Sequence, residues 1–174
     1  MNFLTGKIRP MYFKYLVAAF GSALISSIYG VVDMAMVGQY QGADGTAALA
    51  VVSPVWNISY SLGLLMGIGG SVVFSNLRGK SEENHKKSNE YFTAALIGVA
   101  ALAVITWVTV IFFDRELLLL FGAEETLLPL ARRYIFPVKF VVPSFLFTQL
   151  MAAFLRNDGN PALATRAVLF GGFF

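Results

Sequence analysis

The sequence predicts an all-α protein, a polytopic bundle of transmembrane helices. Hydrophobic residues make up 57% of the 174 positions, and charged residues only 13%, where an ordinary soluble domain has about 25% charged residues. The mean hydropathy is +0.68. The charged residues gather between long apolar blocks. A chain this apolar cannot cover itself with a polar surface, so these observations exclude a soluble globular domain.

The apolar blocks have the length of membrane spans. A hydrocarbon core of about 30 Å needs roughly 20 helical residues. Four blocks reach that length, at residues 12–37, 47–77, 92–113 and 130–155. A fifth block, 161–174, would rise only about 21 Å at 1.5 Å per residue. We therefore expect residues 1–174 to form an incomplete bundle of four full spans and the start of a fifth.

The positions of lysine and arginine predict the orientation of these spans. Basic residues occupy the N-terminal segment and the joint after the second span, whereas the loop 39–46 has none. By the positive-inside rule the N-terminus and the joint 78–90 are cytoplasmic, in a multi-pass protein of the cell (inner) membrane. The third joint fits less well, because it also carries arginines. The basic residues concerned are Lys7, Arg9, Lys14, Arg78, Lys80, Lys86 and Lys87, and in the third joint Arg115, Arg132 and Arg133.

Small residues recur every four positions along the second span. Ser59, Gly63, Gly67, Ser71 and Ser75 form this stripe. Small side chains let the backbone of a neighbouring helix approach closely. We expect the stripe to be a helix-packing face.

Two polar residues stand out in the second and fourth spans. Asn57 can form a hydrogen bond to a neighbouring helix. Lys139 lies between Pro137 and Pro143, which should distort the fourth span. A lysine there either lies in a transport cavity or, as is usual near the end of a span, extends to the membrane interface.

The residues needed for an enzyme are missing from the sequence. It has no cysteine and one histidine, which lies in a charged loop. No nucleophile, base or set of metal ligands converges at membrane depth. We therefore expect neither an enzyme nor a protein with a cofactor.

Asp33 is the acidic residue best placed inside a span. At 100° per residue it shares one helix face with Ser22, Ser26 and Gly30, which makes a small and polar stripe that should face protein or water. A carboxylate at membrane depth can exchange a proton for a metal ion, which is the chemistry of ion coupling. The alternative is a solvated polar group near the outer interface.

Several stretches together resemble one transporter family. "YGVVDMAMVGQYQGADGTAALAVVSP", "GLLMGIGGSVVFSNLRGK", "FFDRELLLLFGAEE" and "RNDGNPALA" occur in this order. The chain resembles the opening of the bacterial multidrug and toxic compound extrusion (MATE) family over essentially its whole length. The resemblance implies a transporter of two six-helix bundles (6+6), of which this sequence supplies the first four helices and part of the fifth.

The same resemblance implies a function. It is that of an antiporter in which inward movement of H⁺ or Na⁺ drives export of drugs or toxic organic compounds, often cationic, with Asp33 in the cation-coupling site. Ser26, Gly30, Asn57 and Lys139 are candidates for the cavity or for helix contacts, and Gly63, Gly67 and Ser71 for helix packing. The expected partners are membrane lipid, the small organic substrate and the C-terminal half of the same protein, with no nucleic acid. The alternatives are a flippase for a lipid-linked saccharide and a non-transporting truncated module.

The predicted orientation can be tested directly, because the chain contains no cysteine. Single cysteines at Gln41 and His85 should react with a membrane-impermeant thiol reagent from opposite sides, with Gln41→Cys labelled in intact cells. His85→Cys should be labelled only after the membrane is opened. Labelling of both positions from the same side would contradict the span assignment.

Overall fold

The structure is a bundle of helices. The computed structural model describes residues 8–79, 84–158 and 161–171, and within these ranges it contains five helices and no strand. The helices are α1 (Ile8–Arg78), α2 (His85–Phe112), α3 (Asp114–Leu120), α4 (Leu128–Asn157) and α5 (Pro161–Gly171). Among the residues that the structure describes, three stretches are long and apolar enough to cross a membrane, at Ser27–Arg78, His85–Phe112 and Leu128–Asn157. These helices confirm the predicted fold class. A helix suits a chain in lipid because it satisfies its own backbone hydrogen bonds.

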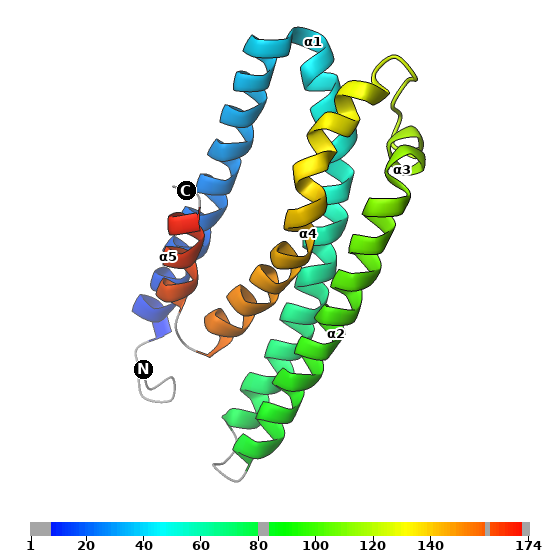
Figure 1. Ribbon diagram of the computed structural model, residues 1–174. Coiled ribbons are helices and arrows are strands. Elements are labelled where there is room, and N and C mark those ends of the chain that lie inside the picture. The colour runs from blue at the N-terminus through cyan, green and yellow to red at the C-terminus, as the bar shows by residue number, and fades with distance from the viewer. Residues whose placement is uncertain (1–7, 80–83, 159–160, 172–174) are drawn as a thin grey trace.

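A bend at Gly42 divides α1 into two arms. Gly42 has φ 63° and ψ −147°, a left-handed conformation that glycine adopts without a steric penalty. Figure 1 shows the chain reversing direction at the top of the bundle, between the blue and the cyan parts of α1. Residues 8–41 are the first arm and residues 43–78 the second arm. The expected spans 12–37 and 47–77 lie in these two arms.

The second arm of α1 packs closely along α4. A Cβ atom built on Gly67 would lie 3.0 Å from Cβ of Ala153 and 3.1 Å from Cα of Leu150. Gly63 meets α4 one turn earlier, where a Cβ would lie 3.1 Å from the carbonyl oxygen of Leu146. The stripe of small residues in the second span therefore faces α4, and its glycines let the two backbones approach.

The buried serines of this stripe satisfy their own hydroxyl groups. Ser59 and Ser71 are both fully buried. The Ser59 hydroxyl donates to the carbonyl of Val55 at 2.7 Å, and the Ser71 hydroxyl to that of Ile68 at 3.2 Å. Because these bonds stay within α1, the stripe can be buried without an orphaned polar atom.

The prolines do not break their helices. Pro54 lies inside α1, and the carbonyl of Ala50, which a proline cannot bond, accepts the hydroxyl of Ser53 at 2.8 Å. In α4 the helix continues past both Pro137 and Pro143. The core forms where the second arm, α2 and α4 meet, and its fully buried members include Val52, Val99, Ile135, Val142, Leu146 and Leu150.

Gly67→Leu should separate α1 from α4. The added side chain meets backbone atoms of α4 at about 3 Å, so the two helices must move apart, at a cost of about 1–3 kcal/mol. Gly69→Leu is the matched control, because nothing lies within 4 Å of a Cβ at that position. Denaturation in mild detergent measures both. Equal stability of the two variants would contradict the packing face.

Candidate functional site

Asp33 lies on the first arm of α1, and its side chain is exposed. Gly30, one turn earlier, is also exposed and has no heavy atom within 4 Å of its Cβ position. α2 and α4 therefore leave this face of the arm uncovered. Within the described ranges there is no group of three or more acidic or histidine side chains placed to hold a metal ion. Asp33 is thus a single carboxylate on an open face of an apolar helix.

The structure does not gather the other sequence-predicted site residues around Asp33. Asn57 lies on the second arm, where its side chain is exposed, and its backbone carbonyl accepts the hydroxyl of Ser61 at 2.8 Å. Ser26 lies in the first arm, but its side chain is outside the described part of the structure. Lys139, on α4, belongs to a different cluster.

That cluster is built around Asp114, the first residue of α3. Its Oδ2 accepts hydrogen bonds from Nζ of Lys139 at 2.8 Å and from Nε of Arg132 at 3.1 Å. Arg132 Nη2 adds a bond to Oδ1 at 3.2 Å, so the arginine holds the carboxylate with both arms of its fork. Arg132 and Lys139 are two helical turns apart on α4 and lie on the same side of it. The cluster thus ties the junction between α2 and α3 to α4.

Burial and charge act in opposite directions on Asp114. The side chain is only 8% exposed and that of Lys139 15%, whereas Arg132 is half exposed. Burial alone raises the pKa of the Asp114 carboxyl, but the hydrogen bonds and positive charges of Lys139 and Arg132 outweigh it and hold the pKa below the usual value. Asp114 therefore stays ionised at neutral pH and neutralises the Lys139 ammonium.

Reasoning from the sequence missed this cluster, because it considered Lys139 only as a cavity residue or an interface residue and named no counter-charge for it. The signal was present in α4. A lysine inside an apolar helix needs a counter-charge, and Arg132, two turns before it, marks the face on which to look. The partner lies 25 residues from Lys139 in the chain, so only the packing of α3 on α4 identifies it.

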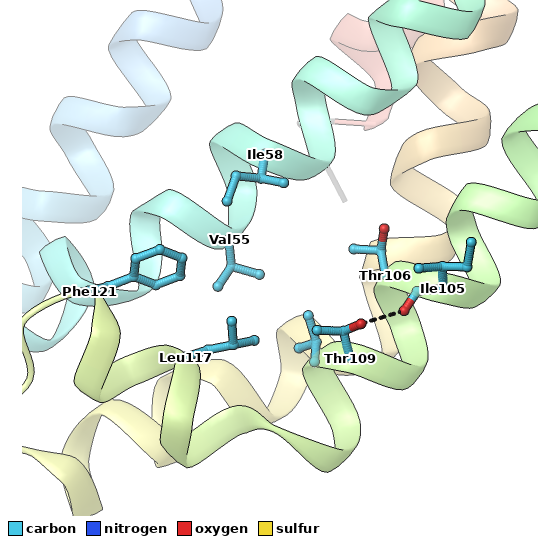
Figure 2. A pocket seen from close by; sticks show the side chains of 8 residues that line it. Val55, Ile58, Ile105, Thr106, Thr109, Leu117 and Phe121 are labelled. Atoms are coloured by element: carbon cyan, nitrogen blue, oxygen red, sulfur yellow. Dashed lines mark hydrogen bonds between the residues drawn. The ribbon is translucent and has the colours of Figure 1, made fainter.

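An apolar pocket of about 220 Å³ lies between the second arm of α1, α2 and α3. Figure 2 shows side chains from all three helices around it, among them Val55 of α1, Thr109 of α2 and Leu117 of α3. The hydroxyl of Thr109 donates to the carbonyl of Ile105 at 2.8 Å, and that of Thr106 to Leu102 at 2.8 Å. No charged side chain lines this pocket, so its lining offers no counter-charge to a bound cation.

A family comparison covers almost the whole chain. The model of the MatE family matches residues 18–173. This chain belongs to the MatE family. The match confirms the resemblance that the sequence predicts. Members of the MatE family are transporters and not enzymes, so a catalytic role is excluded. It is also a multi-pass membrane protein, as its apolar helices and its relatives indicate.

Named relatives of this MatE chain are multidrug exporters. It is 25% identical over 146 residues to the multidrug export protein MepA of Staphylococcus aureus strain MSSA476, and the match covers 84% of this chain and 32% of the relative. It is 24% identical over 147 residues to MepA of Staphylococcus saprophyticus, with the same shares covered. The chain thus spans about a third of the length of these relatives. No solved structure matches it at a significant level.

Asp114→Asn should destabilise the MatE chain, because it leaves the Lys139 ammonium at low exposure without a counter-charge. Breaking a buried ion pair costs roughly 3–5 kcal/mol, and the half-exposed Arg132 places this one near the lower end of that range. Replacing both partners, with Asp114→Asn and Lys139→Met, should recover most of the loss. Glu125→Gln is the control, since it breaks the exposed pair with Arg115 (2.8 Å) and should cost less than about 1 kcal/mol. Thermal denaturation in detergent decides; equal losses for the two single variants would contradict the buried pair.

The same contact predicts a pH dependence of stability. Because the folded-state pKa of Asp114 is lowered, its stabilisation is fully present above the ordinary aspartate value of 3.8 and is lost as the pH falls through the lower folded-state value. Wild-type melting temperature should therefore drop more steeply below pH 4 than that of the Asp114→Asn, Lys139→Met double variant. Parallel curves would show that the cluster does not carry this dependence.

Proposed function

We propose that this chain is the N-terminal part of a cation-coupled antiporter that exports drugs or other toxic organic compounds across the cell membrane. The observation that carries the proposal is the exposed carboxylate of Asp33 on an apolar, membrane-length arm of α1. The MatE match and the multidrug exporters among its relatives support it.

Asp33 is suited to coupling because its charge is not neutralised by an ion pair among the described residues. A carboxylate on an apolar helix is a binding group for a proton, a Na⁺ ion or a cationic group of a substrate. One carboxylate cannot hold an inward-moving cation and an organic cation together. Competition for Asp33 would then link inward movement of H⁺ or Na⁺ to outward movement of the substrate.

Asp114 does not compete for this role. Its oxygens accept hydrogen bonds from both Lys139 and Arg132, and its lowered pKa keeps it ionised. Binding another cation would require breaking these bonds. Asp114 is therefore a structural anion, whereas Asp33 is an exposed acid well inside a membrane-length arm.

In this proposal, the remainder of the transporter corresponds to the part of the relatives that this chain does not cover. Alternating access needs two bundles that move against each other around a site near the middle of the membrane. We infer that the uncovered Asp33 face of the first arm lines the space shared with the other bundle, and that the N-terminus is cytoplasmic. The substrate is then a small organic compound, often cationic. The coupling ion is H⁺ or Na⁺, and no cofactor is needed.

The alternative of a saccharide flippase is less well supported. Such a carrier needs cationic side chains in its cavity to hold a lipid-linked phosphate, and Lys139 was the candidate in the sequence. The Lys139 ammonium is instead 2.8 Å from the Asp114 carboxylate, and its side chain is only 15% exposed. A truncated, non-transporting membrane module would form complexes without moving any solute.

Asp33→Asn tests the coupling role in the exporter that contains this chain. The amide keeps the size of the side chain and removes its charge, so substrate efflux driven by an imposed H⁺ or Na⁺ gradient should fall at least about tenfold in proteoliposomes, as expected for loss of one essential proton-transfer group. Folding should survive, because the side chain is exposed. Asp44→Asn is the control, another exposed acid eleven positions along α1, and should leave efflux unchanged. Unimpaired efflux by Asp33→Asn would return Asp33 to the role of a solvated polar group.

A further inference from the structure

A second pocket lies where α4 ends against the hairpin of α1 and α2. It has a volume of about 280 Å³, and the side chains that line it include those of Arg78, Phe92, Met151, Phe154, Leu155 and Asp158. In Figure 1 the orange end of α4 stops short of the lower end of the α1 and α2 hairpin, which continues beyond it. We name this hollow the α4-end pocket.

The floor of the α4-end pocket is aromatic and apolar. The ring centres of Phe92 and Phe154 are 5.0 Å apart in a T-shaped contact, and Phe74 joins them at 5.4 Å from Phe154. Phe154 is almost fully buried, whereas Met151 is exposed. A flexible hydrocarbon chain can lie on such a surface and remove it from water.

Two opposite charges stand at the mouth of this pocket. Arg78 is the last residue of α1, and Asp158 follows the last residue of α4. Nη1 of Arg78 lies 3.3 Å from Oδ1 of Asp158, and the two side chains are 43% and 48% exposed. The guanidinium carbon of Arg78 also lies 5.2 Å from the centre of the Phe74 ring. Stacking on Phe74 thus positions a guanidinium whose five N–H donors exceed what one carboxylate oxygen uses.

The position of these charges matches the depth of a lipid headgroup. α2 has 28 residues, and a helix of that length rises about 42 Å, longer than the hydrocarbon core of about 30 Å. Arg78 and Asp158 both lie at the ends of apolar, membrane-length stretches, where the core gives way to headgroups. A phospholipid matches this arrangement, because its acyl chain can lie on the apolar floor while its charged headgroup meets the charged groups at the rim.

We propose that the α4-end pocket binds a phospholipid whose headgroup carries both a phosphate and a primary ammonium. Its phosphate would accept hydrogen bonds from Arg78, its ammonium would donate to Asp158, and one acyl chain would lie on Phe92, Met151 and Leu155. A zwitterionic headgroup fits because the two protein charges sum to zero. An anionic lipid would face Asp158 unfavourably, and a quaternary ammonium has no N–H to donate.

Native mass spectrometry of the full chain in mild detergent tests this with three lipids of identical acyl chains. Phosphatidylethanolamine should be retained about tenfold more than phosphatidylcholine or phosphatidylglycerol, as expected for one charge-assisted hydrogen bond. Equal retention of the three lipids would overturn the proposal. So would a preference for phosphatidylglycerol, because the exposed Lys86 and Lys87 nearby in the sequence would then account for binding by charge alone.

Variants assign the preference to the two residues. Asp158→Asn should lower retention of phosphatidylethanolamine to that of phosphatidylcholine, and Arg78→Gln should lower retention of all three lipids. The control is the exposed Arg115–Glu125 pair (2.8 Å), where Arg115→Gln and Glu125→Gln should leave the preference intact. The wild-type lipid series remains decisive if a variant does not fold. An unchanged preference in Asp158→Asn would overturn the proposal.

A soluble headgroup separates a lipid from a free phosphate compound. Glycerophosphoethanolamine carries the same charges without acyl chains, so it should not displace phosphatidylethanolamine at equal concentration. Displacement would show that the aromatic floor contributes nothing, and the lipid would then be the wrong occupant.

Discussion

The close approach of α1 and α4 is the constraint on which the rest of this structure depends. In lipid the hydrophobic effect does not drive helices together, so they associate through tight packing and hydrogen bonds. Gly63 and Gly67 supply that packing, because a side chain at either position would collide with α4. The hydrogen bond from Asn157 Nδ2 to Ser71 Oγ, at 2.6 Å, secures the same pair of helices further along. Together these contacts fix the position of α4 along the length of α1.

The position of α4 along α1 decides which charged side chains meet. At one end of α4 it brings Asp158 to Arg78, and near the other it brings Lys139 and Arg132 within reach of Asp114. Each charge that pairs in this way is neutralised by its partner. Among the residues that the structure describes, no ion pair involves Asp33, which therefore differs from Asp114 in environment and not in chemistry. In the proposed function the two acids have different roles: Asp114 stabilises the contact between helices, and Asp33 exchanges cations.

Much of the helical architecture could be predicted from the sequence, because it follows from local properties. The length of the apolar blocks predicts helices of membrane length, and the four-residue spacing of Gly63, Gly67 and Ser71 predicts a packing face. The glycine at position 42 appeared only as part of a polar loop, although its conformation produces the reversal between the two arms. The Asp114 cluster could not be predicted, because Arg132 and Lys139 lie 18 and 25 residues after Asp114 in the chain. These side chains meet only after α3 packs on α4. The pairing of Arg78 with Asp158 is equally non-local.

The most direct test of the proposed coupling role is an infrared titration of the Asp33 carboxyl group in the reconstituted protein that contains this chain. Infrared difference spectra would be recorded as H⁺ or Na⁺ is varied, with and without a cationic substrate, and the Asp33 band would be assigned by its loss in Asp33→Asn. If Asp33 couples the two movements, its carboxyl band should change with the coupling ion and be altered by the substrate, since both compete for one group. A band that responds to neither, or spectra of Asp33→Asn identical to those of the wild type, would contradict the role of Asp33 in coupling.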